Sequence, residues 1–429
     1  MHKSKEIQNK KINARLYPIY KMISWDLLFY YSIIYLFLTQ AKNFTASQIL
    51  LSEAFFTVSC LILQIPLGLV VDRFGKKNSL VFANVCMCIF MVILLFTNTY
   101  IQLLIAFFAD AIGYVIKGIC ETNILYDSLP TGNKRGSLYS TIDGKGSSGY
   151  YIMDAVTSLI TGFAFVVSPY LPIILCLIGN IIATVLSTRF RHTYIPDDDE
   201  EQTGVKEYFS ELKDAIKFAI TSKRLLCLLL FFGLISGINY NLTTFRGGIL
   251  EQIQLPEQYF GIVYAMIQIA ASISARMQNF IHKKFRNRTL TVIGTPMAIF
   301  PMLIGILATG KVGNIRTVMI ICMFVTLGAS KGAYHVLTQR YLNNFTNRKI
   351  RTKLATIRNT VYNIFSILVS LLGAWLLGIT NASNSIIILG IIATILLLFL
   401  LYYMKDKVGL KPEEYSEKDL KYSHLLNMK

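Results

Sequence analysis

Long apolar runs alternate with short polar turns along almost the whole sequence. Each run approaches or exceeds the ~20 residues that an α-helix needs to cross the hydrocarbon core of a bilayer. The pattern predicts about twelve spanning helices, at residues 17–40, 49–71, 79–97, 100–123, 149–168, 170–189, 224–248, 257–280, 288–309, 315–338, 354–378 and 384–404. The sequence therefore predicts an all-α integral membrane protein.

A polar stretch at residues 190–223 divides the predicted helices into two halves of six. Within it, residues 205–220 carry apolar positions at helical spacing, which predicts an amphipathic linker helix along the cytoplasmic surface. The halves share a faint repeat, with matching Lys-Gly pairs that begin at Lys117 and Lys331, as in transporter folds built from structural repeats. The predicted domains are an N-terminal tail at 1–16, a six-helix bundle at 17–189, a linker at 190–223, a second six-helix bundle at 224–404 and a C-terminal tail at 405–429.

The composition and the placement of charge support a membrane protein. Hydrophobic residues make up 54% of the chain and charged residues only 15%, less charge than a soluble protein carries. The formal net charge is +18, but the basic residues lie in alternate turns, which indicates membrane topology rather than nucleic-acid binding. Because the basic segments include the N-terminal tail and residues 73–77, we expect both termini in the cytoplasm and the chain in the plasma membrane. The seven cysteines lie in or near apolar runs without Cys-x-x-Cys spacing, so we expect no disulfide, metal or other cofactor.

One short turn, between the second and third predicted helices, carries a recognisable motif. A glycine can adopt positive φ there and end the helix without a steric penalty, and the basic residues fix the turn at the cytoplasmic face. The pattern is G-x-x-x-D-R-x-G-K-K, formed by Gly68, Asp72, Arg73, Gly75, Lys76 and Lys77.

This pattern resembles the loop between helices two and three of the major facilitator superfamily. The resemblance implies a fold of two pseudo-symmetric six-helix halves and secondary transport by alternating access. It also implies that Asp72 acts as a cytoplasmic latch on the start of the eleventh helix, near residues 351–353. In drug–proton antiporters of that family a Gly-Pro-rich stretch lies in the fifth helix. Here Gly144, Gly146 and Gly149 precede the predicted fifth helix and no Gly-Pro follows, which sets the chain apart from those antiporters.

Polar and charged residues inside the predicted helices are candidates for the transport pathway, because a charge at the bilayer centre costs ~3 kcal/mol or more. Asp26 lies close to the middle of the bilayer in the first predicted helix, which makes it the first candidate for proton coupling, with a static ion pair to Lys117 or Lys331 as the alternative. Lys117 and Glu121 lie on one stripe of the fourth, where they form either a structural ion pair or part of a binding site. The candidate substrate and proton-pathway residues are Asp26, Tyr30, Asp110, Lys117, Glu121, Asp154, Asn239, Arg246, Gln268, Arg276, Lys331, His335, Asn359 and Asn363. The resemblance implies that those in the first, fourth, seventh and tenth helices line a cavity.

The sequence contains no phosphate-binding Gly-Lys-Thr/Ser loop, no Gly-x-Ser-x-Gly elbow and no His-Glu-x-x-His helix, so we expect no enzyme activity. The best interpretation is a monomeric secondary transporter of a small-molecule solute, embedded in the lipid bilayer, with protons as candidate drivers. Export of an amphipathic compound is slightly favoured. A nutrient importer of the same fold and a non-transporting membrane sensor or scaffold remain alternatives.

Overall fold

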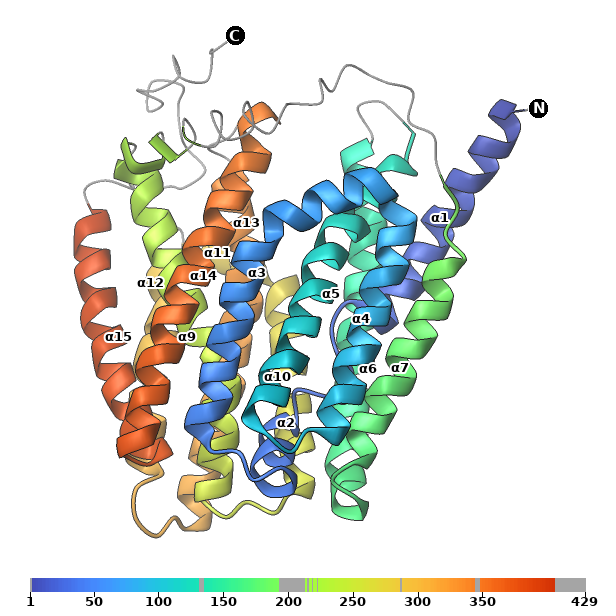
Figure 1. The fold of residues 1–429 in the computed structure, drawn as a ribbon. Coiled ribbons are helices and arrows are strands. Elements are labelled where there is room, and N and C mark those ends of the chain that lie inside the picture. Colours follow the sequence, from blue (N-terminus) through green and yellow to red (C-terminus); the bar gives the residue numbers. More distant parts are fainter. Residues whose placement is uncertain are drawn as a thin grey trace. The chain divides into compact units, whose positions relative to one another are not determined.

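All regular structure that the chain shows over its described residues is helical (Figure 1). The computed structural model describes residues 2–130, 135–192, 223–285, 288–343 and 348–405, with isolated positions between 213 and 221. The linker helix predicted at residues 205–220 lies almost wholly outside these ranges. The chain forms two compact units: Met1–Asp198 with Gln254–Ile269, and Asp199–Ile253 with Ala270–Lys429.

The first unit is built mainly from helices that follow one another along the chain. α4 packs against α5 and α7, α3 packs against α5, and α1 packs against α6. Threonine caps begin α3 and α5: Thr45 and Thr99 each form a capping box with a glutamine three residues later. The helices are α1 (His2–Ser24), α2 (Ile34–Leu36), the π-helix η1 (Phe37–Ala41), α3 (Ala46–Phe74), α4 (Lys76–Phe96), α5 (Tyr100–Asp127), α6 (Arg135–Val167) and α7 (Leu171–Thr188).

The prediction of one continuous first helix at residues 17–40 is wrong. α1 ends at Ser24, residues 25–33 are turns and bends, and helical structure resumes only in α2 and η1. Phe29 in this break has φ 62°, a conformation that bulky residues rarely adopt. The side chain of Asp26 accepts a hydrogen bond from the next backbone N–H, and such local bonds give the backbone an alternative to the helix. Eleven other helices of the described chain are long and apolar enough to cross a membrane.

The fifth spanning helix begins earlier than residue 149, where the sequence analysis placed it. α6 starts at Arg135, so Gly144, Gly146 and Gly149 lie inside the helix rather than before it. A Cβ atom on Gly146 would come within 3.0 Å of the Lys21 side chain, and one on Gly149 within 3.1 Å of Met22. Gly146 and Gly149 therefore allow α1 and α6 to pack closely, and this packing offsets the low helix propensity of glycine.

The second unit is also helical over its described residues. α9 packs against α14 and α15, and α12 packs against α15 and α13. Ser370 on α14 donates a hydrogen bond of 2.7 Å to the amide oxygen of buried Asn241 on α9. The helices are α9 (Lys223–Gln252), α11 (Gln278–Phe285), α12 (Thr289–Leu307), α13 (Asn314–Asn343), α14 (Arg348–Ile379) and α15 (Ala382–Lys405), and α10 (Gln258–Arg276) is divided between the two units.

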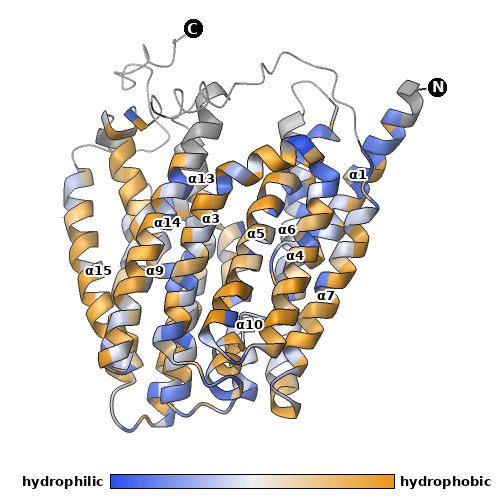
Figure 2. Cartoon of the chain, in the orientation of Figure 1, coloured by the Kyte–Doolittle hydropathy of each residue, from blue (hydrophilic) through white to orange (hydrophobic). Residues whose placement is uncertain are grey.

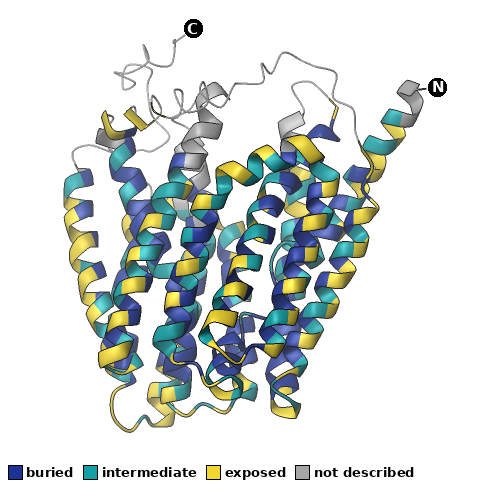
Figure 3. Cartoon of the chain, viewed as in Figure 1, coloured by how far each residue is buried: buried dark blue, intermediate teal, exposed yellow. Residues whose placement is uncertain are grey.

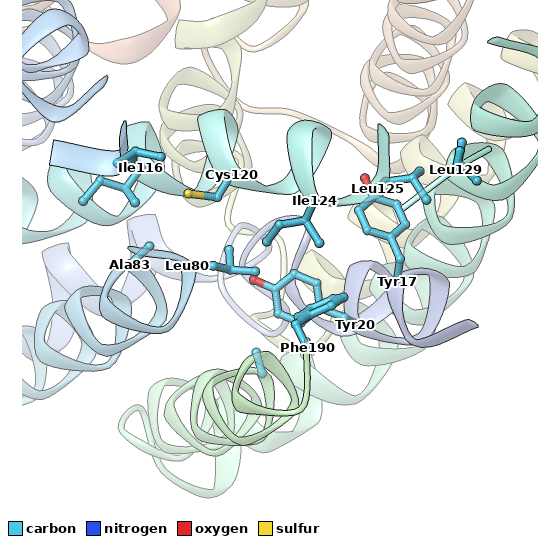
Figure 4. Close-up of a cluster of buried hydrophobic side chains, with 12 residues drawn as sticks. Tyr17, Tyr20, Leu80, Ala83, Ile116, Cys120, Ile124, Leu125, Leu129 and Phe190 are labelled. Carbon is cyan, nitrogen blue, oxygen red and sulfur yellow. The ribbon is translucent and has the colours of Figure 1, made fainter. Parts of the chain in front are cut away.

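Apolar side chains are both buried and exposed, as expected for helices that face lipid. Figure 2 shows hydrophobic residues along the lengths of α3, α7 and α15, and Figure 3 shows exposed positions on the same helices. Ile62, Ile178 and Phe399 are examples, each between about half and two thirds exposed. A buried cluster fills the first unit between α1, α4 and α5, where Tyr20 and Leu80 are almost fully enclosed (Figure 4).

Candidate functional site

The break in the first helix places a carboxylate and an aromatic ring on non-helical backbone. Asp26 is half-buried, and its Oδ1 accepts hydrogen bonds from Leu27 N (2.9 Å) and from the Tyr31 hydroxyl (2.8 Å). Among the described residues no donor reaches its second oxygen, Oδ2. Non-helical backbone at membrane depth is tolerated where protein buries it or where it lines a cavity, and transporters use such breaks to bind substrates and ions.

Aromatic rings surround the break. The ring of Trp25 lies edge-to-face against Tyr150 (5.2 Å between centroids) and Tyr151 (5.3 Å) of α6. On the other side of the break, Tyr30 is buried and packs against Tyr31 at 5.1 Å. Trp25, Tyr31 and Tyr151 are partly exposed, whereas Tyr30 is buried.

A buried ion pair, which the sequence analysis missed, lies one turn before the break. Lys21 is 6% exposed, and its Nζ lies 2.5 Å from Asp143 Oδ1 of α6. The Tyr17 hydroxyl donates to the same oxygen at 2.9 Å, and the Lys21 ammonium lies 4.7 Å from the centroid of the Trp25 ring. A charge inside an apolar run is the signal that identifies Lys21, whereas Asp143 lies before the predicted start of the fifth helix at residue 149.

α5 carries a polar stripe opposite its exposed apolar face. Lys117 Nζ lies 3.9 Å from Glu121 Oε1, so the pair expected from their spacing is present but longer than a hydrogen bond. Asp110 and Glu121 are buried, and Asp110 Oδ1 and Glu121 Oε1 have no hydrogen-bond partner among the described residues. Tyr114, which follows Asp110 by one helical turn, is 53% exposed. Asp110 is close enough to Asp26 for the two carboxyl groups to interact electrostatically.

Two further candidates meet within the first unit. Asp154 of α6 is buried, and its Oδ2 accepts a hydrogen bond of 2.8 Å from Gln268 Nε2 of α10. The same nitrogen donates to the Tyr264 hydroxyl at 2.7 Å. Asp154 lies one helical turn after Tyr150 on α6, and Tyr150 packs against Trp25 in the break.

The turn of the sequence motif has the predicted backbone but shows a different ion pair. Gly75 has φ 81° and separates α3 from α4. Lys76 Nζ lies 2.6 Å from Asp127 Oδ2 at the end of α5, a contact that the sequence analysis did not anticipate. Arg73 is exposed and Lys77 half-buried, while the side chains of Asp72 and residues 351–353 lie outside the described part of the chain. The latch between them stays a prediction.

The candidates of the second unit are more dispersed. Arg246 is buried, and Asn239 and Asn363 are half-buried. By contrast, Arg276, Lys331 and Asn359 are exposed, and the side chain of His335 lies outside the described part of the chain.

A hydroxyl network that the sequence analysis did not single out joins α9 to α13 in this unit. The Tyr334 hydroxyl donates to the Phe232 carbonyl oxygen at 2.6 Å and bonds Ser236. All three residues are buried, so the network contributes to packing rather than to an open surface.

Comparison with known proteins defines the class of this chain. The profile of the Major Facilitator Superfamily matches residues 22–324 and, in a second overlapping match, residues 296–427. The chain therefore belongs to the major facilitator superfamily. It is a multi-pass membrane protein with the transporter fold of this family and not an enzyme. No curated protein matches the sequence.

Several solved structures are similar to this chain in fold. A crystal structure of a point mutant of the nucleoside transporter NupG has a TM-score of 0.75 at 14% identity and covers 92% of this chain and 100% of its own. A bacterial homologue of the human lysosomal transporter Spinster, in an inward-facing and unoccupied conformation, has a TM-score of 0.67 at 14% identity, with 96% and 98% covered. A D-xylose–proton symporter also has a TM-score of 0.67 at 14% identity, with 94% and 98% covered. At these identities the likeness shows the fold alone.

Proposed function

We propose that this protein is a proton-linked secondary transporter that moves a small organic solute across the plasma membrane by alternating access, acting as a monomer. The observation that carries the proposal is the interrupted first helix. Its break holds the half-buried carboxylate of Asp26 beside half-exposed rings. A helix that served only to anchor the chain would have no reason to unwind in the membrane, because each unsatisfied backbone group there costs several kcal/mol.

The proton site of this proposal is Asp110 rather than Asp26. Asp26 is half-buried and receives two hydrogen bonds on one oxygen, so its charge is partly solvated by the protein. Asp110 is 8% exposed and its Oδ1 receives none among the described residues. Burying an ionised carboxylate without partners is costly. Binding a proton removes that cost, and an opening that hydrates Asp110 would release the proton.

Charged groups near Asp110 could change its proton affinity during the transport cycle. Lys117, seven residues along α5, interacts electrostatically with Asp110 but is held by Glu121 at 3.9 Å. Asp26 in the helix break adds a like charge. A movement that changes the distance of either group would change the free energy of protonating Asp110, which is what coupling requires.

Export of an amphipathic compound is the direction we favour, because half-exposed rings lie beside the break. A nutrient importer is the second candidate. The similar structures include a nucleoside transporter and a D-xylose–proton symporter, and an importer of a small polar metabolite would need the same fold and a proton site.

Cells with the gene deleted and cells that overproduce the protein test the direction. Intracellular and extracellular metabolite pools, and susceptibility to a panel of amphipathic drugs, are measured in both. Export predicts that overproduction lowers the internal pool of at least one compound and that deletion raises it. The opposite signs would establish import, and unchanged pools and susceptibilities at confirmed expression would contradict transport.

A further inference from the structure

The break in the first helix brings rings and an open carboxylate to one surface of the first unit. Trp25 and Asp26 are sequence neighbours on non-helical backbone. Tyr150 and Tyr151 of α6 pack against Trp25. Trp25, Asp26 and Tyr151 are all partly exposed, so one ligand can touch ring and carboxylate together.

The charge balance of this surface favours a cation. Asp143 neutralises Lys21 at 2.5 Å, and the pair is largely buried. Asp26 has no ion-pair partner within 4 Å among the described residues, and both of its described hydrogen bonds are on Oδ1, which leaves Oδ2 open. Asp110, the proposed proton site, adds no positive charge to this surface in either protonation state.

The chain already places an ammonium group on the ring that would contact the ligand. Lys21 Nζ lies 4.7 Å from the Trp25 centroid, inside the ~6 Å within which a cation is attracted to a ring face. Aromatic faces recognise quaternary ammonium ions, and a carboxylate beside the ring adds charge attraction. An anionic ligand would depend on Lys21, whose ammonium is already engaged by Asp143 and the ring.

We propose that this surface is the binding site for an organic ammonium ion, a protonated or quaternary amine carried on an apolar or aromatic body. The Asp26 carboxylate forms an ion pair with the ammonium group through Oδ2. The rings of Trp25 and Tyr151 contact the ammonium group and the apolar or aromatic part of the ligand. This inference names the substrate class of the transporter proposed above and rests on that function, but binding is measured without transport.

The fluorescence of Trp25 can report ligand binding at this site. The chain has two tryptophans, Trp25 and Trp375, and Trp375 is 62% exposed on α14 of the other unit. Trp375→Phe therefore leaves Trp25 as the single fluorescent tryptophan. The purified full chain with this substitution, in a neutral detergent, is titrated with benzyltrimethylammonium, and with benzyl alcohol and benzoate as neutral and anionic probes of similar size.

The expected result is saturable quenching or a spectral shift with benzyltrimethylammonium, at a concentration at least tenfold lower than with either other probe. Asp26→Asn should weaken this binding about tenfold or more, since loss of ~1.4 kcal/mol or more of charge attraction is a tenfold change. The asparagine oxygen can keep both hydrogen bonds from Leu27 and Tyr31, so the break should stay intact. Glu6→Gln, an equivalent change in a carboxylate that pairs with Lys10, should leave the affinity unchanged.

Equal responses to the three probes, a preference for benzoate, or no response from a folded protein would overturn the proposal. Unchanged affinity in Asp26→Asn would also overturn it. These outcomes are distinct from failure of the transport function: a neutral solute transported against a gradient, with no ammonium binding, would refute the substrate class alone. Ammonium binding without any solute flux would refute transport and keep the site.

Discussion

Lys21 Nζ and Asp143 Oδ1, 2.5 Å apart, join α1 to α6 across the interior of the first unit. The pair lies only a few residues before the helix break. It therefore fixes the end of α1, so that Trp25 and Asp26 are presented in a defined position although their own backbone is not helical.

Removing one partner of this pair should destabilise the protein. Lys21→Met leaves Asp143 with the Tyr17 hydroxyl as its described hydrogen-bond donor. The expected loss is about 2–3 kcal/mol, below the ~3–5 kcal/mol of a fully buried pair, because the Asp143 side chain is 26% exposed. Thermal unfolding of the purified protein measures it. Asp143→Asn in the Lys21→Met background should recover part of the loss, and strictly additive losses would show that the two charges do not interact.

The glycines of α6 provide a matched pair of variants for the contact between α1 and α6. Gly146 faces Lys21 closely, whereas a Cβ on Gly144 would meet nothing within 4 Å. Gly146→Leu should cost about 1–3 kcal/mol through overpacking. Gly144→Leu should be neutral or stabilising by up to ~1 kcal/mol, because leucine has the higher helix propensity. Equal melting temperatures of the two variants would be inconsistent with close packing at Gly146.

The motif turn offers a comparison of two adjacent lysines. Lys76 pairs with Asp127, whose side chain is only 10% exposed, and Lys77 has no described ion pair. Lys76→Met should lower stability by about 1 kcal/mol or somewhat more, because it leaves a largely buried carboxylate without its cation. Lys77→Met should have little effect and Lys76→Arg should retain most of the stability. Denaturation of the three variants under one condition distinguishes them, and identical curves would exclude the pair as a stabilising contact.

The orientation of the chain is testable with reporter fusions. The distribution of basic residues predicts that the turn at residue 75 lies in the cytoplasm. Reporters fused after residue 75 or 200 should therefore be cytoplasmic, and those after residue 43 or 98 should be outside. A cytoplasmic reporter at residue 98 would contradict the predicted order of the spans.

The sequence predicts most helices well because their apolar length is a strong signal. The turn at Gly75 was also predictable, since a glycine between two apolar runs and among basic residues has few other interpretations. α4 and α5 begin within three residues of their predicted starts and α7 within one.

The break at Asp26 was not predictable from hydropathy, because a window over residues 17–40 averages one carboxylate with many apolar neighbours. In the break, Asp26 Oδ1 accepts hydrogen bonds from Leu27 N and from the hydroxyl of Tyr31, five residues later. Hydropathy does not register either bond. The early start of α6 was missed for a related reason. Its glycines predict a turn in isolation, and the close approach of α1 at Gly146 and Gly149 becomes visible only in the structure.

The most direct test of the proposed proton-linked transport is the electrical current of proteoliposomes on a solid-supported membrane. Nucleosides, pentoses, amino acids, dipeptides and aromatic amines are applied in turn, with and without a pH gradient. We predict that at least one class gives a current above that of protein-free liposomes and that the pH gradient increases it. Asp110→Asn should abolish the effect of the gradient but retain counterflow exchange of the same solute, because only the proton site is lost.

A folded wild-type protein that gives no current and no counterflow with any class would contradict secondary transport of these solutes. An Asp110→Asn variant that keeps the full response to the pH gradient would contradict the assignment of the proton site to Asp110.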